Sequence, residues 1–140
     1  MELKWRIGKI ERKIKMEMLK KAHELGEMIK ESPEMKAMME AEEAQKNDEE
    51  AIKLLQEYNL KRMNLARDLQ EGKMEQAEAI VKNNEYFSEM VKSSQTIENF
   101  VKTKQAFDEM VQKINQVLNY YITGQDPNCT HDCSTCGGCH

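Results

Sequence analysis

Apolar residues recur every three or four positions along most of the chain, which is the spacing of one face of an α-helix. The first run extends to residue 29, and its members are Leu3, Ile7, Ile10, Ile14, Met18, Ala22, Leu25 and Ile29. This run predicts one long amphipathic helix. Ser32 and Pro33 then suit the start of a short second helix, because a serine hydroxyl caps free backbone N–H groups and proline fits the first helical position. The second helix is expected to end near Gln45.

Three further helices are predicted downstream. Asn47 is expected to cap the third, with Asp48 in its first turn, and Gly72 is placed to end it. The last helix runs roughly from residue 95 to residue 122, and Gly124 terminates it. Between them, a fourth helix follows the stripe Met74, Ala77, Val81, Asn84, Phe87 and Val91.

The lengths of these helices predict an elongated molecule. The last helix alone would be about 42 Å long at the helical rise per residue, whereas a compact domain of this size has a radius of gyration of about 14 Å. We therefore expect an all-α, elongated bundle of about five helices with long antiparallel helices. Because one chain cannot cover both ends of such helices, the apolar stripes are expected to be shared in a dimer. Residues 1–124 would form the helical domain and residues 125–140 a separate tail.

Composition agrees with helices and adds a charge asymmetry. The chain is 33% charged and 6% aromatic, with six Gly and two Pro. Its net charge is −4, yet residues 1–21 carry +5, so the remainder sums to −9. The basic first helix could contact RNA phosphates or anionic lipid, but the favoured interpretation is a solvated face opposite the apolar stripe. The acidic remainder would repel nucleic acid, so direct nucleic-acid binding is not expected.

Location in the cell follows from what the apolar runs lack. No run approaches the length of a membrane span. The basic N-terminus has no apolar core of a signal peptide and no small-residue cleavage site. We therefore expect a cytoplasmic protein, and in that compartment clustered cysteines bind metal more often than they form disulfides.

The helical body shows no catalytic signature. It has neither a Gly-rich phosphate loop nor a Ser–His–Asp set, and His23 is the only histidine before residue 131. His23 lies in an amphipathic helix and is interpreted as a surface or seam residue. A redox enzyme that uses Cys136 and Cys139 would need a lowered thiol pKa, which requires a helix N-terminus or basic neighbours. The sequence therefore predicts a protein that is not an enzyme.

All four cysteines lie in the last twelve residues, in the spacing C-x3-C-x2-C-x2-C. Structural zinc usually takes two cysteine pairs separated by a longer loop, whereas iron–sulfur clusters often draw their ligands from one dense run. An iron–sulfur cluster is therefore favoured over zinc, and a thiol-rich tail without a resident metal is the third interpretation. The tail would be disordered until a metal ordered it. The candidate ligands are Cys129, Cys133, Cys136 and Cys139, with His131 and His140 as further metal ligands.

Two stretches of the helical body share a pattern with a known family. They are "AHELGEMIKESPEMKAMMEAEEAQKNDEEAIKLLQEYNLKR" and "TIENFVKTKQAFDEMVQKINQVLNYYI". The matching positions are Leu25, Ile29, Ser32, Glu34, Ala41, Glu42, Asp48, Glu50, Ala51, Leu54, Phe100, Ala106 and Phe107. Over about residues 20–123 the chain resembles the YlbF/YmcA family of bacterial cell-fate and competence regulators. The cysteine-rich C-terminus adds to the resemblance, because YlbF-type members carry one.

The resemblance implies an all-helical protein that forms a homodimer or a heterodimer with a YmcA-type paralogue. YlbF-type proteins act with a YmcA-type and a YaaT-type protein in a complex that carries 4Fe–4S clusters. That complex influences sporulation, competence and biofilm formation and directs endoribonuclease Y toward certain transcripts. The chain would then be a regulatory adaptor without enzymatic activity, with the four cysteines as cluster ligands. The alternative is a zinc-binding helical interaction module without a redox role.

Overall fold

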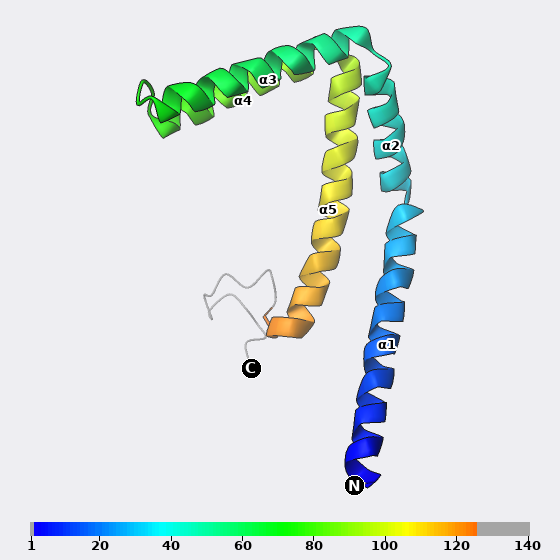
Figure 1. Ribbon diagram of the computed structural model, residues 1–140. Helices are drawn as coiled ribbons and strands as arrows, with labels where there is room; N and C mark the ends of the chain where they lie inside the picture. The colour runs from blue at the N-terminus through cyan, green and yellow to red at the C-terminus, as the bar shows by residue number, and fades with distance from the viewer. Residues whose placement is uncertain (1, 126–140) are drawn as a thin grey trace, which may run out of the picture.

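A computed structural model describes residues 2–125, and these residues form five α-helices and no strand (Figure 1). The predicted all-α architecture and the number of helices are confirmed. The helices are α1 (Glu2–Lys30), α2 (Pro33–Lys46), α3 (Glu49–Gln70), α4 (Gln76–Ser93) and α5 (Gln95–Thr123).

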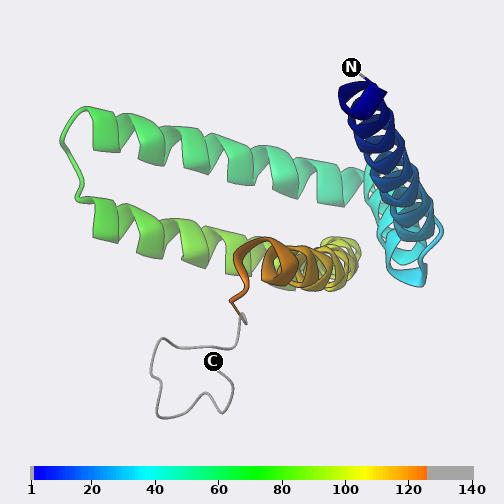
Figure 2. The same cartoon turned by 90° about the horizontal axis from the view of Figure 1, so that it is seen from below.

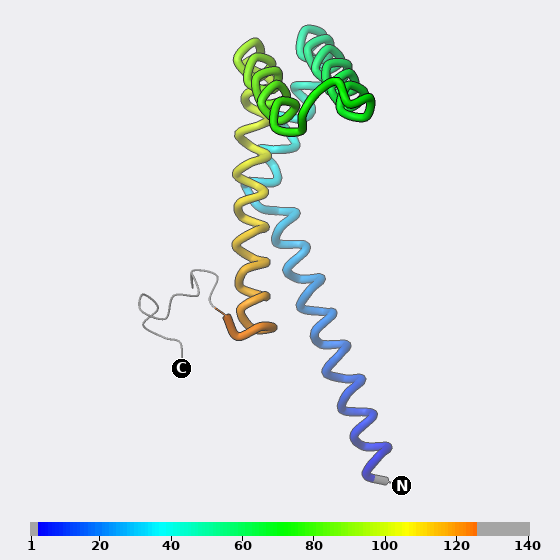
Figure 3. The backbone as a smooth tube through the Cα atoms, turned by 90° about the vertical axis from the view of Figure 1, so that its left-hand side faces the viewer, coloured from blue at the N-terminus to red at the C-terminus, as the bar shows by residue number. Residues whose placement is uncertain are grey.

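The five helices make an elongated rod with a side arm. Helices α1 and α2 follow one another along one side, and α5 returns antiparallel alongside α2 (Figures 1 and 3). Helices α3 and α4 form an antiparallel pair that projects from the far end of the rod, as Figure 2 shows. The expected long antiparallel helices are therefore present, and the molecule is elongated.

The helix ends follow local signals in the sequence. The Ser32 hydroxyl accepts a hydrogen bond from the backbone N–H of Met35 at 3.2 Å, and it precedes a proline at the first position of α2. Gly72 and Gly124 both adopt φ +70°, a left-handed conformation that glycine reaches without a steric penalty. Gly124 lies directly after α5 and Gly72 lies two residues after the end of α3, so both glycines stand at helix ends as expected.

The expected cap of α3 was wrong by one residue. Asn47 has φ −95° and ψ −1°, which is helical backbone, and it ends α2. Asp48 has φ −102° and ψ 106°, the extended geometry of a residue that caps a helix. The chain between α2 and α3 is so short that one residue ends the first helix and the next begins the second.

The core is small and lies where α3, α4 and α5 meet. Ala51 is 0% exposed, Ile97 is 1% exposed and Met90 is also buried. Half-buried side chains surround these three, namely Leu54, Leu55, Tyr58, Val91 and Val101. The arm has its own contact, because the rings of Tyr58 and Phe87 meet edge to face at 5.9 Å.

Large apolar side chains remain exposed at the free ends of the rod. On α1 they include Leu3, Ile7, Ile10, Ile14 and Met18, and on α5 they include Val117, Leu118, Tyr121 and Ile122. An amphipathic helix ordinarily buries its apolar stripe. One copy of the described chain leaves these stripes uncovered, and the dimer predicted from the sequence stays a prediction.

Replacing Ile97 by alanine tests where the core lies. Because Ile97 is fully buried in the cluster that joins α3, α4 and α5, Ile97→Ala should reduce the free energy of unfolding by about 2–5 kcal/mol. Ile122→Ala removes the same atoms from a side chain that is 79% exposed. This variant should change the free energy of unfolding by less than about 0.5 kcal/mol. Urea denaturation followed by circular dichroism measures both. Equal losses in the two variants would contradict the assigned core.

Candidate functional site

The predicted metal ligands all lie beyond the described residues. Cys129, Cys133, Cys136, Cys139, His131 and His140 follow the last described residue, Gln125. The structure does define the point from which they extend. Gly124 ends α5 by donating its N–H to the carbonyl of Tyr120 at 2.8 Å. The helical body thus stops before the first cysteine, and the iron–sulfur ligation stays a prediction.

The described body itself holds no competing cluster of metal ligands. Among residues 2–125, no group of three or more His, Cys, Asp or Glu side chains is close enough to hold a metal ion. Its acidic side chains are spread along solvated helix faces, where several pair with a lysine one turn away, as Glu98 does with Lys102 at 2.8 Å. Pairs of this exposed kind contribute little to stability.

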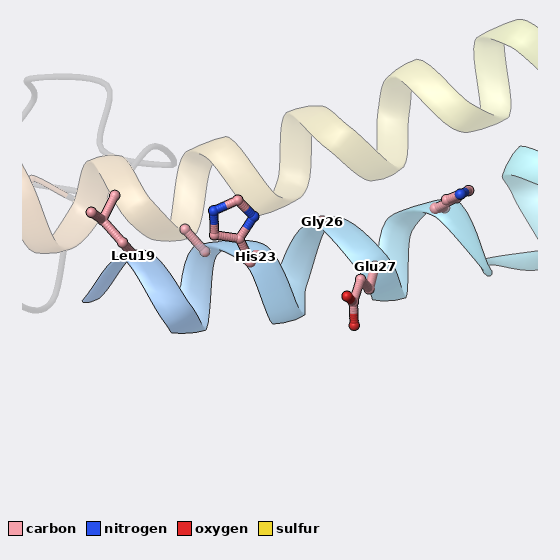
Figure 4. A pocket seen from close by; sticks show the side chains of 6 residues that line it. Leu19, His23, Gly26 and Glu27 are labelled. Atoms are coloured by element: carbon pink, nitrogen blue, oxygen red, sulfur yellow. The ribbon is translucent and has the colours of Figure 1, made fainter. Parts of the chain in front are cut away.

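His23 lies exposed on α1, as expected for a surface residue. A shallow open groove of about 380 Å³ runs along this part of the helix. Figure 4 shows Leu19 and His23 one turn apart, with Gly26 and Glu27 further along the same helix. All of its lining residues come from α1, so the groove is a helix surface. It offers no second element that could position a catalytic partner for the imidazole.

The most constrained polar site is the elbow between α2 and α3. One carboxylate oxygen of Asp48, Oδ1, accepts the backbone N–H groups of Glu50 at 3.1 Å and Ala51 at 3.2 Å. The other oxygen, Oδ2, accepts the hydroxyl of Thr96 at 2.7 Å. One side chain therefore caps α3 and ties it to the first turn of α5, a residue 48 positions away.

The surroundings of Asp48 favour its charged form. The Thr96 hydroxyl, followed by the N–H of Ala51, lowers the pKa of the carboxyl against the opposing effect of burial. The adjacent Ala51 is fully buried and has no side chain beyond Cβ, which lets α3 approach its neighbours closely. The elbow sets the direction of the α3–α4 arm relative to the rod. Sequence reasoning placed Asp48 in the first turn of α3 and missed its bond to Thr96.

The second candidate site is a contact surface at the end of α5. Val117, Leu118, Tyr120, Tyr121 and Ile122 are all exposed there, directly before the helix ends. Tyr120 and Tyr121 contact each other edge to face, with ring centroids 5.4 Å apart. Exposed aromatic and aliphatic side chains in one place are typical of protein interaction sites. This surface also lies next to the residue from which the tail extends.

Comparison with known proteins identifies the helical body. Residues 18–123 match the family model described as "Control of competence regulator ComK, YlbF/YmcA". The matched stretch begins within α1 and ends with the last residue of α5. No curated protein matches the chain. None of the helices within residues 2–125 is long and apolar enough to cross a membrane.

Asp48 should make the stability of the fold depend on pH. Because its pKa is lowered in the folded state, its charge stabilises the fold at pH values above the ordinary aspartate pKa of about 3.9. That contribution is lost as the pH falls through the lowered folded value. Asp48→Asn should therefore melt at a lower temperature than the native chain at pH 7, and the difference should shrink on acidification.

Thermal melts at several pH values measure this effect. Asp108→Asn is the matched control, since Asp108 lies exposed on α5 and pairs only with Lys104 on the same helix at 2.8 Å. Melting curves of Asp48→Asn that run parallel to the native curve at every pH would contradict the assigned role of the carboxylate.

Proposed function

The chain belongs to the YlbF/YmcA family of proteins that control competence, and on that premise we propose that it is a regulatory adaptor without catalytic activity. The family match over residues 18–123 carries this proposal, because it takes in the second half of α1 and all of the other four helices. An adaptor needs surfaces for partners rather than an enclosed site. The exposed apolar side chains at the end of α5 and along α1 are surfaces of that kind.

The C-terminal cysteines would bind a 4Fe–4S cluster. Four thiols within eleven residues form a donor set that suits this cofactor, since soft thiolates are its usual ligands. Because α5 ends before the first of them, the tail would bind the cluster without any change in the helices. Cys129, Cys133, Cys136 and Cys139 are the proposed ligands, and zinc on the same thiols is the alternative.

The partners would be a second copy or a YmcA-type paralogue, together with a YaaT-type protein. Uncovered stripes on α1 and at the end of α5 support such assembly, because isolated apolar faces of this length are costly in water. In this cytoplasmic complex the chain would influence competence, sporulation and biofilm formation and direct endoribonuclease Y toward certain transcripts. Its contribution would be binding, and the metal would couple assembly to iron supply and redox state.

Cysteine substitutions test the proposed cofactor. Cys133→Ser and Cys136→Ser should lose iron and the visible absorption of the protein, because each removes one thiolate from the donor set. Helicity should stay at the native level, since the helices end at Thr123. Ser134→Ala, between the two cysteines, is the matched control and should keep its iron. Metal and sulfide analysis after anaerobic purification gives the result. A colourless protein that holds zinc would contradict the cluster and support the zinc alternative. A loss of helicity would contradict the separation of body and tail.

Gene deletion tests the regulatory role in cells. Removing the gene from its own host should change the steady-state levels of a defined set of transcripts, because an adaptor acts by redirecting other proteins. Complementation with the native gene should restore those levels, whereas the Cys133→Ser gene should not. RNA sequencing measures this. Unchanged transcripts in the deletion strain would rule out the proposed role in transcript processing.

A further inference from the structure

The first half of α1 is a helix without a covering partner in the described chain. It projects beyond the end of α5 (Figures 1 and 3). Leu3, Ile7, Ile10 and Ile14 are exposed by 74%, 49%, 58% and 53%. Further along the same stripe, Leu25 and Ile29 are half-buried. The family match begins only at residue 18, so these four residues lie outside it and the family assignment does not explain them.

The spacing of the four residues is that of a coiled-coil seam. They are separated by steps of four, three and four residues, which places Leu3 and Ile10 at heptad position d and Ile7 and Ile14 at position a. A strict a and d stripe is narrower than the apolar face by which a helix packs on a globular core. Isoleucine at position a with leucine at position d, as in Ile7 and Leu3, favours two-stranded coils, whereas Ile10 at position d is also compatible with three strands. The pattern therefore fits a second helix.

Two observations argue against a lipid surface at this seam. Trp5, the natural anchor at a membrane interface, lies on the opposite side of the helix from the stripe, where the ammonium of Lys9 lies 5.2 Å from the centre of its ring. Glu11 borders the seam directly, and an anionic surface would repel it.

The charges beside the seam select the partner. Lys4 and Glu11 occupy position e, and Arg6 and Lys13 occupy position g. In a parallel pair of helices, each g residue faces the e residue of the next heptad in the other chain. Arg6 then faces Glu11 of the partner subunit, and symmetry makes this attraction occur twice. Lys13 faces Met18 of the partner subunit, so no like charges meet. An antiparallel pair would bring Lys4 against Glu11 but would also oppose Arg6 and Lys13, so only the parallel pair is free of like-charge contacts.

We propose that residues 3–14 of α1 pair in parallel and in register with the same residues of a second copy. The seam forms a short two-stranded coiled coil that extends the dimer beyond the family domain. Arg6 and Glu11 fix its direction and register, and Lys9 and Arg12 lie on its outer surface. The inference rests on the proposed pairing of chains and adds the surface, the direction and the register.

A charge exchange tests the seam in the full-length protein. Arg6→Glu and Glu11→Arg each place like charges across both symmetric contacts, so each should raise the dimer dissociation constant about tenfold at low salt. The double variant restores opposite charges and the native net charge, and should return to within roughly threefold of the native value. Sedimentation equilibrium under reducing conditions gives these constants, and circular dichroism checks that helicity is unchanged.

Apolar variants supply the matched control. Ile10→Asp places a charge in the seam and should weaken the dimer at least as strongly as the charge variants. Met16→Asp makes a similar change on the face away from the seam and should leave the constant unchanged. These two results support the seam, and the charge exchange supports its parallel direction.

Three outcomes would overturn the proposal. If the double variant dimerises as weakly as the single variants, Arg6 and Glu11 do not face each other. If none of the substitutions affects the native dimer, the two chains still pair, but their interface lies outside residues 3–14. The third outcome is a native chain that stays monomeric but binds phosphatidylserine vesicles, with affinity that follows net charge among the variants. It would assign the segment to a lipid surface.

Discussion

The meeting of three helices around Ala51 and Ile97 determines the shape of the described chain. Side chains of α3, α4 and α5 exclude water together there, and both residues are almost completely buried. Asp48 fixes the angle at this point, because one carboxylate caps α3 and accepts the hydroxyl of Thr96. The rest of the described chain extends from this core. The rod and the arm are long helices held at one end, so their far ends present side chains that a single chain cannot cover.

That constraint explains how binding surfaces arise in so small a protein. A 140-residue chain that folded compactly would bury most of its apolar side chains. Here the small core leaves apolar stripes on α1 and at the end of α5 available to partners. The proposed metal ligands are separate from this architecture, since the cysteines follow the last described helix. The chain combines a helical body of the YlbF/YmcA family with a thiol-rich extension.

The sequence predicted the helices well because their signals are local. The stripe spacing, the serine and proline at the start of α2 and the two glycines after α3 and α5 each act within a few residues. The elbow was less predictable. Asn47 and Asp48 are both good caps, and only the backbone at the turn decides between them. The hydrogen bond from Thr96 to Asp48 joins residues 48 positions apart, and nothing in the sequence near either residue indicates the other. The metal site in the cysteine tail was predicted from the spacing of its residues alone, and the tail lies outside the described residues.

The account depends most on the idea that the tail of this regulator carries an iron–sulfur cluster. Its most direct test is the iron, sulfide and zinc content of the native protein purified from its own host without oxygen. The account predicts a coloured protein with iron and sulfide in equal amounts and little zinc. A colourless protein that contains zinc, or no metal, would contradict it.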